Sequence, residues 1–296
     1  MAIFSPCPAC AGTCSPVFEA TDENRRVSAR AFHYVQCTAC RLIFLPEFPA
    51  DLHDYYRGEY YAIPDAPTLK ALARKDTNKI DTIRRFVQSG RLLEVGPAFG
   101  VFAWQAKDAG FAVGAIEMDP RCCDYLNDTL DIPTVRSDQP HAAIKDMPPH
   151  DVIAIWHVIE HLPEPFLFLE SAAANLAPGG ILVIATPNPQ AFQFRLMGRH
   201  WPHVDAPRHL TLIPSDLLVR MAGAAGLETV LLTSDDSDAR SWNRFGWQRL
   251  LMNRVRTRPL QAAAYALGWL ISLVFAPWDR HNGSAYTLVL KKKVGE

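Results

Sequence analysis

Residues 91–120 carry the clearest chemical pattern in the chain. Gly96 and Gly100 follow the apolar run 92–95, and Glu117 directly follows a second apolar run at 112–116. Glycine has no Cβ, so the backbone at these positions can approach a ligand closely. A carboxylate at the end of the second run can accept hydrogen bonds from the two hydroxyl groups of a ribose. The pattern therefore predicts a site for a cofactor that contains a nucleoside.

The residues around the first glycine narrow the choice of nucleoside. A dinucleotide site has the pattern Gly-x-Gly-x-x-Gly, which seats a pyrophosphate on a helix N-terminus. Here Ala98 replaces the middle glycine, and Glu94 lies two residues before Gly96. A carboxylate is a poor neighbour for a pyrophosphate and a good one for a positively charged ligand. The alternative is a turn of an ordinary α/β protein that binds nothing.

This segment resembles motif I of the class I S-adenosylmethionine-dependent methyltransferases, Asp/Glu-x-Gly-x-Gly-x-Gly, with proline and alanine at two typical positions. The resemblance continues through a strand and polar loop at 151–163 and through a Pro-Gly-Gly turn and strand at 176–187. It spans residues 75–234 and the last strand at 285–290, and it is closest to the branch with ubiquinone-pathway O-methyltransferases and glycan or natural-product methyltransferases.

The resemblance implies an α/β fold with a Rossmann-like sheet of order 3-2-1-4-5-7-6, in which the seventh strand is antiparallel. It also implies S-adenosylmethionine as the cofactor. The residues it assigns to the cofactor are Glu94, Gly96 and Gly100 around the methionine part, Glu117 at the ribose, Met118 on the adenine, Asp138 at the adenine amino group, and Trp156 and His157 at the mouth of the site.

The residues His157-x-x-Glu160-His161 also match the inverted zincin motif, in which two histidines of one helix bind zinc. The context argues against a protease, because the motif directly follows a buried strand of an α/β series. We interpret Glu160 and His161 as braces for the following loop. A divalent cation at this loop, as considered for some ubiquinone-pathway relatives, is the less favoured alternative.

Four cysteines form two Cys-x-x-Cys pairs, Cys7 with Cys10 and Cys37 with Cys40, and 26 residues separate the pairs. Four thiolates at such spacing are typical of a structural, tetrahedral zinc site. Cys14 is a spare that could replace one ligand. Disulfide bonding is the alternative, and it is disfavoured because no signal-peptide pattern precedes the cysteines.

We interpret residues 1–50 as a zinc-ribbon-like module, 51–90 as an aromatic linker with a leading helix, and 91–296 as the methyltransferase core with an insertion at 235–284. The module is either a nucleic-acid reader or a folding staple for a segment too small to build its own core. Similar methyltransferases of sugar and natural-product pathways carry such a module, which favours the staple. The linker tyrosines either pack the module on the core or roof the active site; they are Tyr55, Tyr56, Tyr60 and Tyr61.

His209 is the candidate general base. An imidazole titrates near neutral pH and can take the proton of an acceptor hydroxyl while the methyl group moves. His209 belongs to a Pro-x-His-Leu-like segment that relatives place beside the acceptor, and its alternative role is structural. Trp201, His203 and Arg208 are second-rank candidates for shaping the acceptor pocket.

The insertion contains 19 residues without a charge, from 260 to 278. Its length would permit a membrane span, but the following strand must return to the sheet. We therefore expect either a helix packed over the acceptor pocket, which is the favoured reading, or peripheral contact with a membrane. Upstream arginines would suit an anionic lipid surface; they are Arg249, Arg254, Arg256 and Arg258.

The composition fits a cytoplasmic enzyme with one large domain and a small module. A net charge of −1 argues against a dedicated nucleic-acid binder. We expect methyl transfer, most simply O-methylation, to a small-molecule, sugar or lipid-linked acceptor. One alternative is a nucleic-acid methyltransferase, although residues 186–189 lack the aromatic residue that stacks a flipped base. The other is a non-catalytic cofactor-binding protein.

Overall fold

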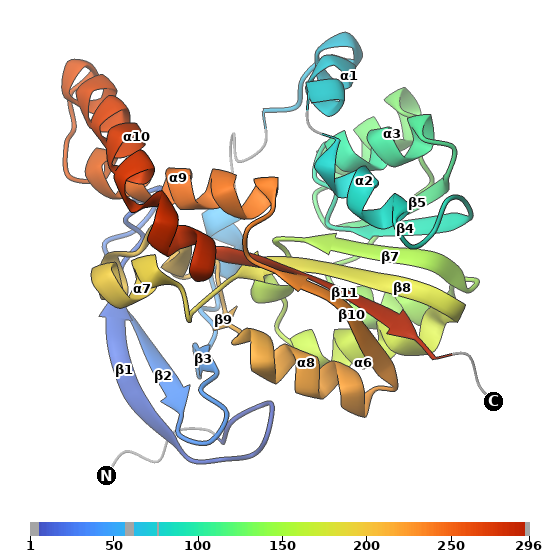
Figure 1. Ribbon diagram of the computed structural model, residues 1–296, viewed down its shortest axis with the longest axis horizontal. Coiled ribbons are helices and arrows are strands. Elements are labelled where there is room, and N and C mark those ends of the chain that lie inside the picture. Colours follow the sequence, from blue (N-terminus) through green and yellow to red (C-terminus); the bar gives the residue numbers. More distant parts are fainter. Residues whose placement is uncertain (1–5, 57–61, 76, 294–296) are drawn as a thin grey trace.

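The computed structural model describes residues 6–56, 62–75 and 77–293, and within them the strands form two sheets (Figure 1). The strands of the larger sheet are β4 (Arg91–Val95), β5 (Ala112–Glu117), β6 (Thr134–Arg136), β7 (His150–Trp156), β8 (Leu176–Pro187), β10 (Leu227–Thr233) and β11 (Ala285–Lys292). Those of the smaller sheet are β1 (Cys14–Ala20), β2 (Phe32–Cys37), β3 (Ile43–Phe44) and β9 (Thr211–Leu212).

Helices lie on both faces of the larger sheet (Figure 1). The helices are α1 (Ala66–Lys75), α2 (Asn78–Arg84), α3 (Val101–Asp108), α4 (Pro120–Asp124), α5 (Pro140–Ala143), α6 (Pro165–Asn175), α7 (Phe192–Met197), α8 (Ser215–Ala224), α9 (Ser237–Met252) and α10 (Arg258–His281). In Figure 1, α2 and α3 cover one face, and α6 and α8 cover the other.

The order of the larger sheet is β6-β5-β4-β7-β8-β11-β10, which confirms the predicted order 3-2-1-4-5-7-6. β11 is antiparallel to both β8 and β10, also as predicted. The register aligns Val95 with Ile116 on one side and with Ile155 on the other. The parallel strands therefore end at one common edge of the sheet, which is where open α/β sheets bind ligands.

The central strands have no polar face. Every side chain from Val152 to Ile155 and from Ile181 to Ala185 is fully buried. This pattern is typical of a parallel sheet covered by helices on both faces, and it explains why these segments are continuous apolar runs.

The smaller sheet joins the N-terminal module to the segment that follows β8. Its order is β1-β2-β3-β9, and the last strand comes from the segment between β8 and α8 rather than from the module. The pairs Ile43 with Leu212 and Phe44 with Thr211 close this contact. Tyr55 packs edge-on against Phe32 of β2, with 5.9 Å between the ring centres. This linker tyrosine therefore packs against the N-terminal module. Tyr60 and Tyr61 lie outside the described residues.

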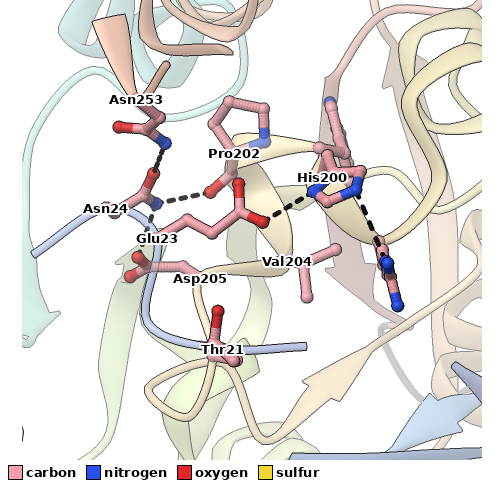
Figure 2. A pocket seen from close by; sticks show the side chains of 11 residues that line it. Thr21, Glu23, Asn24, His200, Pro202, Val204, Asp205 and Asn253 are labelled. Atoms are coloured by element: carbon pink, nitrogen blue, oxygen red, sulfur yellow. Dashed lines mark hydrogen bonds and ion pairs between the residues drawn. The ribbon is translucent and has the colours of Figure 1, made fainter. Parts of the chain in front are cut away.

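A buried ion-pair network strengthens the same junction. The Arg208 guanidinium is fully buried and lies 2.6 Å from Asp22 Oδ1 and 2.7 Å from Asp205 Oδ1. Asn24 of the module donates to the Pro202 carbonyl at 2.7 Å and to Asp205 Oδ1 at 2.6 Å (Figure 2). Two segments that are about 180 residues apart in sequence are thereby fixed to each other.

The insertion forms a helical hairpin, and one expectation about it is wrong. The cavity described below is lined by α9 residues, among them Trp242, Phe245 and Arg249, and not by the apolar stretch 260–278. That stretch belongs to α10, which packs on the far side of α9. The reason is that α9 is inserted between β10 and α10 and takes the position over the cavity.

Replacing Arg208 with methionine should lower the free energy of unfolding by on the order of 3–5 kcal/mol, because Asp22 would remain buried without its guanidinium partner. Urea denaturation measures this loss. The matched control is Arg220→Met, which removes an exposed ion pair with Asp216 and should cost less than about 1 kcal/mol. Equal small losses in both variants would show that the network does not hold the junction.

Candidate functional site

The turn after β4 brings the backbone close to its neighbours. Gly96 has φ +71°, and a Cβ there would lie 2.5 Å from Val158 Cγ2. Gly100 has φ +85°, and a Cβ there would lie 2.5 Å from Leu126 Cδ2. Both conformations favour glycine, so the predicted glycine turn is a structural requirement of this edge.

Glu117 lies at the end of β5 and is held by the backbone around it. Its Oε1 accepts hydrogen bonds from the N–H groups of Met118 at 2.7 Å and Asp119 at 2.9 Å, and its Oε2 accepts one from Ala98 at 2.9 Å. Burial raises the pKa of Glu117, and these three N–H groups oppose that shift. The carboxylate is thus fixed in place next to the glycine turn.

Glu94 is buried beside Glu117, and its Oε2 has no hydrogen-bond partner among the described residues. Burial raises the pKa of Glu94 to about 8; Glu117 acts in the same direction and Lys79 opposes it. The Lys79 ammonium lies 4.8 Å from the centre of the Trp156 ring. This corner therefore holds a buried acid that lacks a full partner and attracts positive charge.

Met118 follows β5 and Asp138 follows β6, and both residues are exposed at the same edge of the sheet. The Met118 side chain is 49% exposed, which is unusual for methionine and leaves an apolar surface beside Glu117. Asp138 is exposed and follows Ser137, whose N–H donates to the Glu117 carbonyl at 2.9 Å. The structure thus brings the predicted cofactor residues together along the ends of β4, β5, β6 and β7.

The segment after β7 connects this edge with a second space. His157 has a left-handed backbone with φ +55°, and Val158 packs against Gly96. His157 Nε2 lies 2.6 Å from Asp238 Oδ2 of α9. Burial alone would raise the pKa of Asp238, but His157 and neighbouring groups hold it down at about 2. The insertion therefore contributes a carboxylate that orients His157.

A cavity of about 520 Å³ lies beyond this segment. It is lined by residues of the N-terminal module, the β7 and β8 ends, the segment after β8, and α9; these are Asn24, Arg25, His157, Glu160, His161, Pro187, Pro202, His203, Asp205, His209, Trp242, Phe245 and Arg249. Its volume falls within the range of small-molecule sites, about 300–1,000 Å³. Arg249 Nε is buried at this cavity and has no hydrogen-bond partner in the part of the chain that the structure describes.

Two histidines that line the cavity contact backbone carbonyls through Nδ1. His209 Nδ1 lies 2.7 Å from the His203 carbonyl, and His161 Nδ1 lies 2.9 Å from the Arg208 carbonyl. A carbonyl accepts only, so His209 Nδ1 carries a proton toward the His203 carbonyl, which leaves Nε2 as the nitrogen that can accept. Burial, and secondly His161, holds the pKa of His209 well below its ordinary value. His209 is therefore a neutral imidazole with a free acceptor nitrogen.

Glu160 is the fully buried acid among these histidines. Its Oε2 accepts a hydrogen bond from Thr186 Oγ1 at 2.9 Å, whereas its Oε1 has no hydrogen-bond partner among the described residues. Oε1 lies 3.8 Å from His157 Nδ1 and 3.9 Å from His209 Nε2. Ligand atoms of Glu160, His161 and His209 lie within 4.8 Å of one another. The cluster can hold a proton or a cation.

The four predicted cysteine ligands also come together, with their sulfur atoms all within 4.8 Å of one another. Cys7 and Cys40 are 3.5 Å apart at Sγ, as are Cys10 and Cys37. Zinc–sulfur bonds of about 2.3 Å imply tetrahedral edges of about 3.8 Å. A disulfide requires about 2.05 Å, and all seven cysteines are free here.

The cysteine loops share one backbone geometry. Ala11 N–H donates to the Cys7 carbonyl at 2.8 Å, and Arg41 N–H donates to the Cys37 carbonyl at 3.0 Å. Ala11 and Arg41 both have positive φ. A Cβ at Gly12 would lie 3.2 Å from two of the sulfur atoms, so glycine is needed beside the cluster. Cys14 lies outside the four-sulfur group.

Comparison with known proteins identifies the larger unit. Residues 64–232, more than half of the chain, match a protein family described as a methyltransferase domain. The chain belongs to this family. With the strand order 3-2-1-4-5-7-6, the methyltransferase has the class I fold, whose methyl donor is S-adenosylmethionine.

Curated relatives match part of the methyltransferase. It is 25% identical over 151 residues to a ubiquinone biosynthesis O-methyltransferase of Saccharophagus degradans, covering 49% of this chain and 61% of the relative. It is 31% identical over 124 residues to a protein of the same name from Caulobacter vibrioides, covering 40% of this chain and 48% of the relative. The methyltransferase thus spans less than two thirds of the length of these relatives.

A solved structure resembles the fold. A SAM-dependent methyltransferase from Archaeoglobus fulgidus matches with a TM-score of 0.51 at 17% identity, over 76% of this chain and 94% of that chain. At this identity the likeness shows the fold alone.

The residues of the methyltransferase fit S-adenosylmethionine. Glu94 offers an unpartnered, buried carboxylate oxygen to a cationic ligand. Gly96 and Gly100 leave no room for side chains at the turn. Backbone N–H groups hold the Glu117 carboxylate where it could accept hydrogen bonds from a ribose, and the exposed Met118 side chain could pack on an adenine ring. These residues would hold the cofactor.

Sequence reasoning missed three contributors to this site. Asp238 was assigned only to an insertion, although its carboxylate orients His157. Lys79 was placed in a leading helix, although its ammonium lies on Trp156. Tyr56 was weighed only as one of a group, although its hydroxyl lies 3.0 Å from His161 Nδ1. The sequence contained an indication only for Tyr56, which belongs to a cluster of tyrosines. A tyrosine side chain combines a large apolar ring with a hydroxyl group that can form a hydrogen bond.

Cofactor binding to the methyltransferase at pH 7 should release up to one proton, because a cationic ligand favours the charged form of Glu94, whose pKa is otherwise about 8. The proton release should shrink as the pH rises through 8, because Glu94 is then already ionised in the free protein. Calorimetry with S-adenosylmethionine in two buffers of different ionisation enthalpy measures the released fraction. Glu94→Gln should abolish the proton release. Release that persists in this variant would show that a group other than Glu94 supplies the proton.

Proposed function

We propose that this chain transfers a methyl group from S-adenosylmethionine to a hydroxyl oxygen of a small molecule bound in the 520 Å³ cavity. The observation that carries the proposal is the free Nε2 of neutral His209 beside Glu160 in that cavity. His157 lines the cavity, and the next residue, Val158, packs against Gly96 of the glycine turn, which supports adjoining cofactor and acceptor sites.

The cofactor supplies a methyl group already activated on a sulfonium, so the protein's task is positioning and proton transfer. His209 Nε2 takes the acceptor's hydroxyl proton as the oxygen forms its bond to the methyl carbon. Glu160 then stabilises the imidazolium from 3.9 Å. Asp238 fixes His157 at the boundary between the two sites.

The lining favours a ring-containing acceptor with an anionic group. Trp242 and Phe245 form one aromatic wall, and the buried Nε–H of Arg249 at the same cavity has no partner among the described residues. A carboxylate or phosphate would complete that hydrogen bond. The names of the relatives, ubiquinone biosynthesis O-methyltransferases, support O-methylation of a small molecule. A sugar or a lipid-linked ring remains within the proposal.

We propose that Cys7, Cys10, Cys37 and Cys40 hold a structural zinc ion. Burial raises the pKa of Cys7 to about 11 and also raises that of Cys40. Burial acts the same way on Cys37, but backbone N–H groups of Cys40 and Ala39 hold its pKa down at about 6, so Cys37 is the thiol most readily available to zinc as a thiolate. The module pairs with β9 next to the acceptor cavity, which supports a staple that shapes the acceptor site. A nucleic-acid reader would need a basic surface, and the net charge is −1.

We propose a cytoplasmic location, supported by seven free thiols, with peripheral attachment argued below. The two other function classes considered from the sequence are a nucleic-acid methyltransferase and a non-catalytic binding protein. The 520 Å³ cavity with its free imidazole nitrogen supports a small-molecule enzyme over both.

His209→Gln should lower kcat on 3,4-dihydroxybenzoate about 10²–10⁴-fold while leaving cofactor affinity unchanged, because it removes the base and not the cofactor site. Release of S-adenosylhomocysteine measures turnover. In the wild type, kcat should stay level from pH 8 down to pH 6, since the low pKa of His209 keeps it deprotonated. His33→Gln, at an exposed position on β2, is the matched control.

Two results would revise this assignment. Activity abolished by a chelator and restored by a divalent cation would make Glu160, His161 and His209 a cation site instead of a base. Full activity of His209→Gln would make this histidine structural.

Purified protein should contain about one zinc ion per chain, because four thiolates complete a tetrahedral site. Cys37→Ser should lose the metal and loosen the module, while the cofactor still binds at the ends of β4 and β5. Elemental analysis and calorimetry measure both effects, with Cys122→Ser as the control outside the cluster. A zinc-free wild-type protein would refute the proposal.

A further inference from the structure

α10 is apolar around its whole circumference but contacts the protein along one stripe. Gly268 packs on the backbone of α9, where a Cβ would lie 2.5 Å from Gln248 Cα. Phe275 stacks on Trp247 with 4.9 Å between ring centres. Asp279 is buried and accepts a hydrogen bond from Trp247 Nε1 at 3.0 Å. These contacts fix the C-terminal half of the helix to the domain.

The remaining circumference carries large apolar side chains that face outward. The most exposed are Leu260, Tyr265, Leu267, Trp269, Leu270, Leu273, Val274 and Trp278, with between 43% and 66% of each residue exposed. α10 is long and apolar enough to cross a membrane, yet only 11% of its most apolar 18-residue window is buried. A helix that is apolar all round is normally enclosed by protein or by lipid.

Positive charge gathers at the start of this helix. Arg254, Arg256 and Arg258 are exposed, and no carboxylate partner for them occurs among the described residues. From residue 253 to residue 278 the sequence contains no acidic residue. In Figure 1, α10 projects from the body of the molecule, away from the seven-stranded sheet. Basic residues beside exposed aromatic and aliphatic side chains are typical of segments that bind anionic lipid surfaces.

We propose that the α9–α10 hairpin docks on an anionic lipid surface, with the projecting part of α10 in the headgroup region and the three arginines on the lipid headgroups. The helix lies on the surface and does not span it. β10 precedes the hairpin, β11 follows it, and these two strands pair with each other from Leu227 opposite Lys292. Both ends of the hairpin are thereby held on the same side of the membrane.

The distribution of apolar side chains favours lipid over a second copy of the chain. A helix of a partner protein would cover one further stripe of α10 and leave the rest in water. A lipid surface has no fixed shape, so headgroups and acyl chains can cover a wider arc of a projecting helix than one partner helix can. Trp269, Trp278 and Tyr265 have an apolar ring and a polar atom, which suits the boundary between headgroups and acyl chains.

Flotation of the full-length protein with vesicles tests the proposal. The wild type should co-float with vesicles of phosphatidylglycerol and phosphatidylcholine at low salt, and high salt should reduce the bound fraction severalfold. Leu270→Glu/Val274→Glu should reduce binding at least tenfold. The matched control, Leu72→Glu/Leu167→Glu, places the same charges at exposed leucines of α1 and α6 and should bind as the wild type does.

A second variant separates the charge from the apolar surface. Arg254→Gln/Arg256→Gln/Arg258→Gln should lower binding to the anionic vesicles severalfold and remove most of its salt dependence. Circular dichroism and S-adenosylmethionine affinity should be unchanged in all variants, because the cofactor edge is built from other elements. Absence of co-flotation at low salt would overturn the proposal. So would a dimer in sedimentation that Leu270→Glu/Val274→Glu converts to monomer.

Discussion

The Arg208 guanidinium is the contact on which the geometry of the acceptor side depends. It is fully buried between Asp22 of the N-terminal module and Asp205 of the segment after β8. The backbone carbonyl of Arg208 lies 2.9 Å from His161 Nδ1, and the next residue in the chain is His209. A buried cation of this kind is tolerated only when several acceptors surround it, so these segments must assemble together. The charge therefore fixes the positions of both histidines at once.

The acceptor side and the cofactor side use buried acids in different ways. On the cofactor side, Glu94 keeps an oxygen without a partner and its pKa is raised, so it gains most when a cation arrives. On the acceptor side, Glu160 lies near His161 and His209, and the Nδ1 atom of each of these histidines contacts a backbone carbonyl. In the proposed mechanism, Glu160 Oε1, which has no partner among the described residues, stabilises the positive charge that forms on His209. Glu94 is thus placed to stabilise the charge of a cationic cofactor, and Glu160 is placed to stabilise a charge on a histidine.

Much of the fold could be predicted because its signals are local. The runs 92–95, 112–116 and 227–233 are short and bounded by turn residues, and the structure has strands there with nearly the same limits. Gly96, Gly100, Glu94 and Glu117 also belong to one stretch, so their common edge follows from one βαβ unit. The paired cysteines likewise met as predicted, because each pair closes its own tight loop.

The remaining contacts join residues that are distant in sequence, and no local pattern indicates them. His157 and Asp238 are 81 residues apart, and their contact depends on how α9 sits over the ends of β7 and β8. β9 has two residues, too few for a periodic signal. The apolar run at 260–278 predicted a helix, but only the tertiary arrangement decides which of its faces are covered.

The pairing of β3 with β9 has a consequence for how this enzyme could diversify. The first fifty residues reach the acceptor cavity through Asn24 and Arg25, while the residues at the glycine turn belong to strands that the module does not join. If the cavity is the acceptor site, as proposed above, substitutions in the module can alter which molecule is accepted without altering how the methyl donor is held. Related chains could then keep one nucleoside site through evolution and exchange acceptor preference by changing this small module.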